Sequence, residues 1–111
     1  MPAITYTKLF EPSLISTSAT EYYEVPANNT LRAGRVRITN VTGTAATVSI
    51  NAIPAAGSNA DSNAVVKAYS IAANDFKDFD LPIMKAGDTL EALAGTASAL
   101  TIHAIDGVLF S

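Results

Sequence analysis

The chain has 111 residues, which is the size of one domain. Hydrophobic residues make up 49% and charged residues only 15%, which excludes a disordered chain and predicts a surface poor in charge. The net charge of −3 argues against a general nucleic-acid binder, because such proteins are usually basic. Cysteine is absent, which excludes disulfides, a thiolate nucleophile and a cysteine-based zinc site.

Membrane insertion and export through a signal peptide are both unexpected. No apolar run approaches the roughly 20 residues that a membrane-spanning helix needs. The first residues, 1–6, lack the basic and apolar regions of a signal peptide. We therefore expect no contact with a membrane.

The N-terminal segment, residues 1–20, is less regular than the rest of the chain. Two interpretations remain open: an arm that pairs with a neighbouring subunit, or an ordinary edge strand. Strands are expected near 3–10 and 20–25, and Pro26 ends the second because proline has no N–H for a strand ladder. Residues 21–111 are expected to form the folded domain.

Alternation of apolar and polar side chains with a period of two dominates the rest of the chain. Val36 and Ile38 alternate with Arg35 and Arg37, for example, as is typical of a strand with one buried and one exposed face. No window predicts a helix. Further strands are expected near 31–40, 45–53, 64–71, 76–81, 88–94 and 99–109.

Short turn signals separate these strands. Residues 41–44 are predicted to form a hairpin, capped by the side-chain amide of Asn40, with Gly43 supplying backbone freedom. Tight turns are also expected at 72–75 and at 85–88, where Gly87 supplies the same freedom.

Regular spacing of short strands and turns predicts an all-β fold. Residues 54–63 form the one longer polar loop between the expected strands. We expect an antiparallel β-sandwich, either jelly-roll or Ig-like, of six to eight short strands. A small barrel is the alternative, because strand order is not encoded in the alternation.

A search for catalytic or metal-binding residues finds little. His103 is the only histidine, and the nucleophile pattern Gly-x-Ser-x-Gly is absent. Asp78 and Asp80 share a strand face, but two carboxylates supply only part of a calcium shell. We therefore expect no enzyme, no metal and no cofactor, and a surface or interface role for His103.

Candidate interface residues come from two groups. Arg35 and Arg37 share a strand face and are expected to meet Asp78 and Asp80, either within the chain or across an interface. Aromatic residues in or near the N-terminal segment are the other candidate contacts, and these are Tyr6, Phe10, Tyr22 and Tyr23.

Several turn and strand motifs resemble those of small virion proteins of tailed bacteriophages. The motifs are a Tyr-x-Val-Pro-Ala entry, an Ile-x-Asn-x-Thr-Gly turn, an Ala-Gly-Asp-Thr-Leu turn and a last strand that ends near glycine. They fall at residues 18–28, 35–48, 71–75, 83–90 and 97–107. Because each is a folding signature, the resemblance implies a structural β-sandwich and assigns no catalytic residue.

The resemblance implies a non-enzymatic virion protein, made in the host cytoplasm. The preferred role is a capsid decoration (cement) protein that forms a homo-oligomer, in particular a homotrimer, and binds the major capsid protein between its subunits. Two alternatives stay open: a tail, collar or fibre-associated virion protein, and a carbohydrate-binding β-sandwich module. No nucleic-acid partner is expected.

Overall fold

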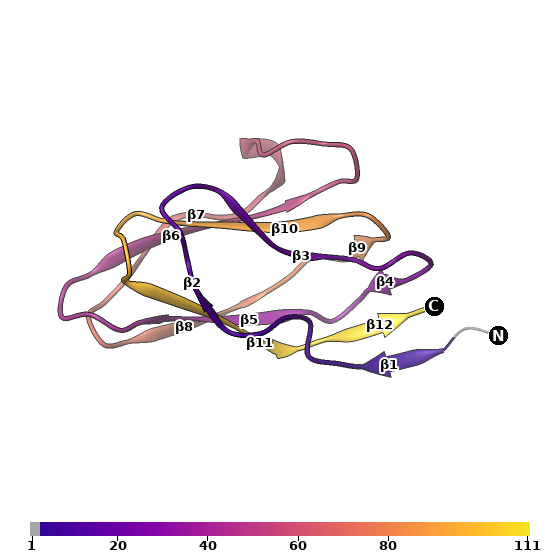
Figure 1. Ribbon diagram of the computed structural model, residues 1–111, viewed down its shortest axis with the longest axis horizontal. Coiled ribbons are helices and arrows are strands. Elements are labelled where there is room, and N and C mark those ends of the chain that lie inside the picture. The colour runs from indigo at the N-terminus through magenta and orange to yellow at the C-terminus, as the bar shows by residue number, and fades with distance from the viewer. Residues whose placement is uncertain (1–2) are drawn as a thin grey trace.

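Strands form nearly all the regular structure in residues 3–111, the part of the chain that the computed structural model describes (Figure 1). The only helix in this range is a short 3-10 helix, η1 (Asp61–Asn63), and no helix there is long and apolar enough to cross a membrane. The prediction of an all-β chain is confirmed. The strands are β1 (Ile4–Tyr6), β2 (Ser13–Leu14), β3 (Thr20–Glu24), β4 (Thr30–Leu31), β5 (Arg35–Asn40), β6 (Ala46–Ile53), β7 (Ala64–Ile71), β8 (Phe76–Asp80), β9 (Met84–Lys85), β10 (Thr89–Ala94), β11 (Leu100–Asp106) and β12 (Val108–Phe110).

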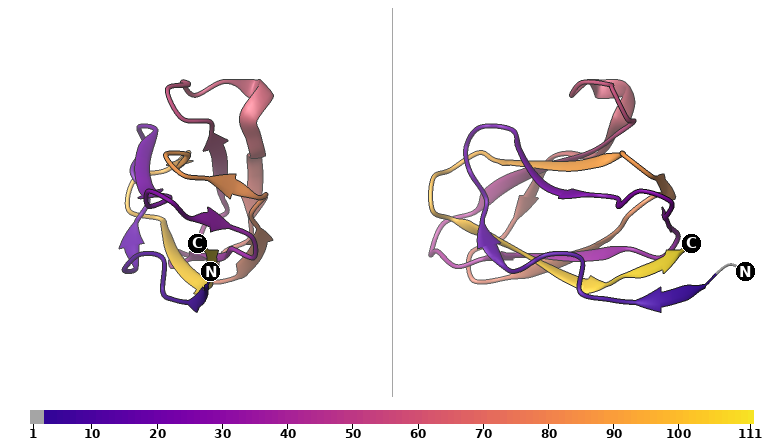
Figure 2. Two further views of the ribbon diagram at one scale, coloured as in Figure 1. Left: turned by 90° about the vertical axis from the view of Figure 1, so that its right-hand side faces the viewer. Right: turned by 45° about the vertical axis from the view of Figure 1, so that its right-hand side comes forward.

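Two four-stranded antiparallel sheets face each other as a sandwich (Figures 1 and 2). One has the order β2-β11-β5-β8 and the other β3-β10-β6-β7. If these eight strands are numbered along the chain, the orders become 1-8-3-6 and 2-7-4-5, which is the jelly-roll arrangement of two Greek keys. The sandwich prediction is confirmed, and of its two forms the topology is the jelly roll.

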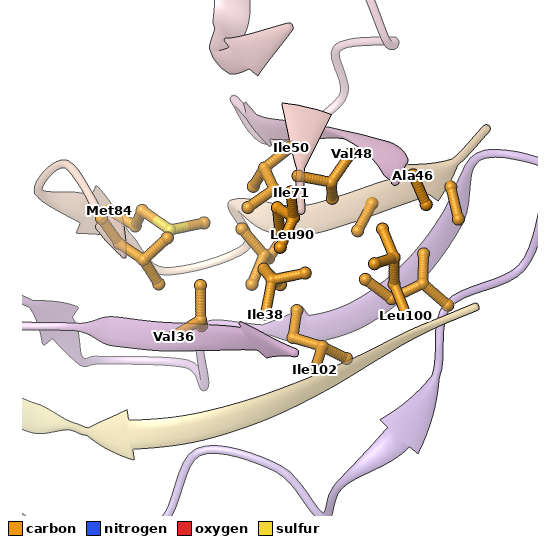
Figure 3. Packing of buried hydrophobic residues seen from close by; sticks show 14 of the residues in the cluster. Val36, Ile38, Ala46, Val48, Ile50, Ile71, Met84, Leu90, Leu100 and Ile102 are labelled. Carbon is orange, nitrogen blue, oxygen red and sulfur yellow. The ribbon is translucent and has the colours of Figure 1, made fainter. Parts of the chain in front are cut away.

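The core lies between these sheets and explains the alternation in the sequence. In β5 and β10 every second side chain is buried, so each strand presents one face to the interior. Figure 3 shows side chains of the two sheets pointing toward one another. Val48, Ile50 and Leu90 come from one sheet, and Ile38 and Ile102 from the other.

A third sheet, β1-β12-β4-β9, continues the β2-β11-β5-β8 sheet along the long axis of the molecule, which measures 49 Å. Each of its strands is the chain neighbour of the strand in the same position of that sheet. The predicted strands 3–10, 31–40 and 99–109 are therefore wrong as continuous elements. Glycines lie at two of these breaks and both are closely covered: a Cβ at Gly34 would lie 2.9 Å from Leu31, and one at Gly107 would meet the Thr7 carbonyl.

The predicted hairpin at 41–44 is also wrong. The strands that it joins, β5 and β6, belong to opposite sheets, so these residues cross the sandwich. Gly43 needs no special freedom, since its φ lies outside the left-handed region and its surroundings are open. The tight turn at 85–88 is confirmed: Asp88 N–H donates to the Lys85 carbonyl at 2.9 Å, and Gly87 has φ +87°.

Asn40 caps the crossing at 41–44 as predicted, and it is buried at 1% exposure. Its Oδ1 accepts hydrogen bonds from the backbone N–H and the hydroxyl of Thr42, at 2.9 and 2.7 Å. Its Nδ2 donates to the carbonyls of Thr44 and Ile71, at 2.9 and 3.0 Å. One side chain therefore links the crossing to the end of β7 in the opposite sheet.

Candidate interaction surfaces

Of the four aromatic residues predicted to make contacts near the N-terminus, one is exposed and three are partly buried. Tyr6, on β1, is 80% exposed, whereas Phe10, Tyr22 and Tyr23 are partly buried and pack against the core. Met1 and Pro2 also belong to the predicted arm and lie outside the described residues. As contacts with a partner, all four aromatic residues remain predictions.

The three partly buried rings fasten the N-terminal segment to β3 of the same chain. The Tyr22 hydroxyl accepts from the Ser16 N–H at 3.0 Å and donates to the Leu14 carbonyl at 3.4 Å. The rings of Phe10 and Tyr23 lie with their centroids 6.3 Å apart. Burial raises the pKa of the Tyr23 hydroxyl, which has no hydrogen-bond partner.

Residues 3–14 form outer strands of their own chain. β1 pairs only with β12, and β2 only with β11. In the structure this segment therefore forms edge strands of its own chain. That it pairs with a neighbouring subunit as an arm stays a prediction.

The predicted pairing of arginines with aspartates is present within the chain. Arg37 binds Asp78 through two hydrogen bonds, Nε–Oδ1 at 2.7 Å and Nη2–Oδ2 at 3.0 Å, while Arg35 Nε donates to Asp80 Oδ1 at 2.9 Å. Hydrogen bonding from Arg37 lowers the pKa of Asp78, and the same contact raises the pKa of Arg37. The ion pairs follow from the register, in which Arg37 lies opposite Asp78 and Arg35 opposite Asp80.

His103 lies in the same row as this pair, across from Arg37 on β11. It is half-buried and next to a cation rather than a carboxylate. In the described part of the chain, no three histidine or acidic side chains come together as a metal site would require. His103 is thus placed on the outer face of the sheet, where it belongs to no catalytic cluster.

A hollow of about 390 Å³ lies where the outer strands β7 and β8 approach each other. Two exposed rings line it, Tyr69 at 43% and Phe76 at 50% exposure. Each ring has a supporting neighbour: Tyr69 meets Phe79 edge to face with centroids 5.5 Å apart, and the Arg37 guanidinium lies 4.3 Å from the Phe76 ring centroid. Ser70, Asp75 and Lys77 supply polar groups around the rings.

A larger hollow, of about 630 Å³, opens beside β9. The loop between β6 and β7 borders it on one side, and the segment between β8 and β9 on the other. Ile83 lines it and is 62% exposed. Its wall is formed by Ala52, Pro54, Ser62, Asn63, Ala64, Val65, Asp80, Leu81, Pro82, Ile83, Met84 and Asp88.

Sequence reasoning assigned no role to Ile83. Ile83 lies between Pro82 and Met84, at the start of the segment 83–90 that carries the Ala-Gly-Asp-Thr-Leu turn. A proline beside it was the only available signal, since proline interrupts the ladder and releases the next residue from strict alternation.

Comparisons with solved structures support the fold alone. A chain of the Bacillus endospore appendages, which are disulfide-linked pili, is 18% identical with a TM-score of 0.55, over 99% of this chain and 87% of that one. A chain of the T13 IBDV viral particle is 12% identical with a TM-score of 0.50, over 98% of this chain but only 30% of that one. Because the present chain has no cysteine, the disulfide linkage of those pili is not open to it.

Comparisons of the sequence alone with known proteins find no match. No model of a protein family matches it, and no curated protein is significantly similar to it. What the comparisons establish is a jelly-roll sandwich of a kind also found in a pilus and in a viral particle.

Proposed function

We propose that this chain is a non-enzymatic structural protein of a phage virion, and in particular a capsid decoration protein. The observation that carries the proposal is the apolar side chains left uncovered on a rigid jelly roll, above all Tyr6 and Ile83. Apolar surface gains free energy when it is buried, at about 25 cal/mol per Å². The phage-like turn motifs support the same role: Asn40 caps its connection and Gly87 adopts a positive φ as predicted, although the connection at 41–44 crosses between the sheets and is not a hairpin.

As a decoration protein, the chain stabilises the head by burying surface where major capsid protein subunits meet. Contacts of each copy are small, but a homotrimer attaches at several points, which raises the effective concentration of each contact. Tyr6 is the leading candidate for a contact with a neighbouring subunit, either the capsid protein or another copy of this chain. Phe10, Tyr22 and Tyr23 hold the segment that presents it, and Arg35 and Arg37 join β5 to β8 through ion pairs on the outer face of their sheet.

The test compares particles assembled with wild-type and altered protein. Deleting residues 1–12 is expected to abolish particle binding, but this change also removes Leu9 and Phe10 from the core. Tyr6→Ala is sharper, because that side chain is exposed and its loss leaves the fold intact. Particles should lose the Tyr6→Ala protein and keep the Thr5→Ala control. Full occupancy by Tyr6→Ala would show that the Tyr6 side chain is not needed for attachment to the particle.

Copy number separates the proposed role from a tail, collar or fibre role. A decoration protein occurs in many copies over the whole head, whereas a collar or tail component occurs in few copies at one vertex. Imaging of labelled protein on purified particles distinguishes the two. His103→Ala is expected to leave binding unchanged, because the residue lies on β11, away from the exposed apolar side chains of Tyr6 and Ile83.

Carbohydrate binding is the second candidate, supported by the hollow lined by Tyr69 and Phe76. Two supported aromatic rings among polar side chains suit a ligand with one apolar face and hydroxyl groups at its edge. A glycan array tests this function. Hits that disappear with Phe76→Ala would favour it, and an array without hits would remove it.

A further inference from the structure

Apolar exposure is concentrated at two opposite edges of the β1-β12-β4-β9 sheet. Among the large apolar residues of the described chain, the three most exposed are Tyr6 at 80%, Ile83 at 62% and Ile4 at 55%. Ile4 and Tyr6 belong to β1, at one edge of this sheet, and Ile83 directly precedes β9, at the other edge. The two positions are separated by β12 and β4, so they do not cover each other within one chain.

The open edge of β1 presents unpaired backbone groups as well as side chains. Ala3 exchanges hydrogen bonds with Ser111, at 3.2 and 2.9 Å, and the Thr7 N–H donates to the Gly107 carbonyl at 2.9 Å. Backbone groups of successive residues in a strand point to opposite sides, so those of Ile4 and Tyr6 point away from β12. Their side chains share one face of β1, because residues i and i+2 of a strand do so.

The hollow beside Ile83 offers a complementary surface. Its wall includes the apolar residues Leu81, Pro82 and Val65. The outer edge of β7, the last strand of its sheet, borders the hollow at Ala64 and Val65, where an added strand finds a partner. The edge of β9 is closed to such pairing, because Asp88 already binds both backbone groups of Lys85.

The negative charge around the hollow is complementary to a lysine that follows β1. Two carboxylates, Asp80 and Asp88, belong to its wall, and Lys8 follows β1 by two residues. Lys8 pairs with Glu11 at 3.0 Å, but both side chains are largely exposed, at 57% and 81%. An exposed pair of this kind contributes little free energy, so Lys8 can leave Glu11. Its new partner is Asp88, which within residues 3–111 accepts hydrogen bonds only from the backbone N–H groups of Ala55 and Lys85. Asp80, by contrast, is already paired with Arg35.

We propose that β1 of one copy docks in the hollow beside Ile83 of the next copy. Ile4 and Tyr6 then pack on the exposed residues Pro82 and Ile83, while the open edge of β1 pairs with β7. The two contacting surfaces differ, so the interface is heterologous and generates either a closed ring or an open chain. This inference rests on the proposed assembly role, since it names the contact between copies, and a ring of three copies is the proposed homotrimer.

The absence of cysteine makes a crosslinking test direct. Tyr6→Cys and Ile83→Cys variants are purified separately, mixed at high protein concentration and oxidised with copper phenanthroline. High concentration is used because each substitution removes part of the contact, and oxidation traps even a weakened complex. The mixture should form a disulfide-linked dimer, and either variant alone should form far less. Val41→Cys replaces Ile83→Cys as the matched control, because Val41 is 53% exposed and lies in the crossing between β5 and β6, at the opposite end of the molecule (Figure 1).

Each possible result of the crosslinking test either supports or overturns the docking of β1. A dominant product between positions 6 and 83 supports the inference. A dominant product between two copies of position 6, an equal yield with position 41, or no product at any concentration overturns it. Tyr6→Ala should also weaken self-association by about tenfold or more in sedimentation, as expected for an aromatic anchor.

The crosslinking test and the test of particle occupancy can fail independently, because the first concerns the contact between copies and the second the virion role. If the protein decorates particles but yields no product between positions 6 and 83, only the docking of β1 is overturned. If that product forms but the protein is absent from particles, the copies associate as proposed and the virion role is overturned instead.

Discussion

Asn40 provides the sharpest test of how the sandwich is held together. Asn40→Ala removes an amide that is 1% exposed and leaves two carbonyl oxygens, those of Thr44 and Ile71, without their Nδ2 donor. A buried polar group left without its partner costs about 1–3 kcal/mol. Thr44 is itself exposed, so its carbonyl recovers a bond from water, whereas the bond to Ile71 is buried. We expect a loss of about 2–4 kcal/mol in the free energy of unfolding.

Thermal and urea unfolding, followed by circular dichroism, measure this loss. For a domain of this size about 1 kcal/mol shifts Tm by roughly 4 °C, so Tm should fall by about 8–16 °C. Asn59→Ala is the control, because that amide is exposed and makes one hydrogen bond, to Glu91 at 3.1 Å. The control should change stability by less than about 0.5 kcal/mol. If Asn40→Ala were as stable as the control, the amide would not hold the crossing at 41–44.

Asn40→Asp separates hydrogen bonding from shape. This substitution keeps the size of the side chain but replaces the Nδ2 donor with an oxygen that faces two carbonyls. An ionised carboxylate there is repelled by both and has lost water. The variant should therefore be less stable than wild type at neutral pH and should recover part of the loss in acid, when protonation restores one donor. A loss that does not depend on pH would contradict this account.

Two further predictions concern Asp78 and Gly87. Because the pKa of Asp78 is lowered in the folded chain, its ion pair with Arg37 contributes stability above the unfolded-state pKa, about 3.9, and loses that contribution as pH falls through the lower folded-state pKa. The difference in stability between wild type and Asp78→Asn should thus shrink in acid, and a difference that grows there would reverse the assignment. Gly87→Ala should cost about 1 kcal/mol or more, because φ is +87° and Ala55 lies 3.1 Å from the new Cβ, whereas Gly43→Ala should be nearly neutral in the same unfolding assay.

Periodicity predicted the long strands because burial on one face is a local property of the sequence. The pairing of Arg37 with Asp78 was predictable for the same reason, since both residues fall on the exposed face of their strands. Strands of two residues, such as β2, β4 and β9, are too short to show a period of two. Their existence depends on the neighbouring strand rather than on their own residues.

The connection at 41–44 shows why topology was harder to predict than strands. Asn40, Thr42 and Gly43 have the chemistry of a turn, and that chemistry serves a hairpin and a crossing between sheets equally well. The choice between them depends on where β6 finds partners, which are β10 and β7. Those strands begin more than ten residues farther along the chain.

The burial of the aromatic residues was hard to predict for a related reason. Tyr22 and Tyr23 are adjacent, so alternation places them on opposite faces of β3. Both are nevertheless partly buried, because the segment that carries Phe10 and Ser16 folds back over this edge of the sandwich. Covering of one strand by a distant segment leaves no trace in the alternation of the strand itself.

β1 differs from its sheet neighbours in what it contributes to the fold. β12, β4 and β9 each bury one apolar residue, namely Leu109, Leu31 and Met84, whereas all three residues of β1 are exposed. Three residues paired on one side make a weak element, so the proposed docking on a neighbouring copy is expected to order β1 further. Amide exchange should therefore be fast at Ile4 and Tyr6 in dilute protein and should slow on self-association, when their N–H groups pair with β7. The amide of Thr5, which faces β12, is the internal reference, and exchange at Ile4 and Tyr6 that ignores protein concentration would exclude β1 from the contact between copies.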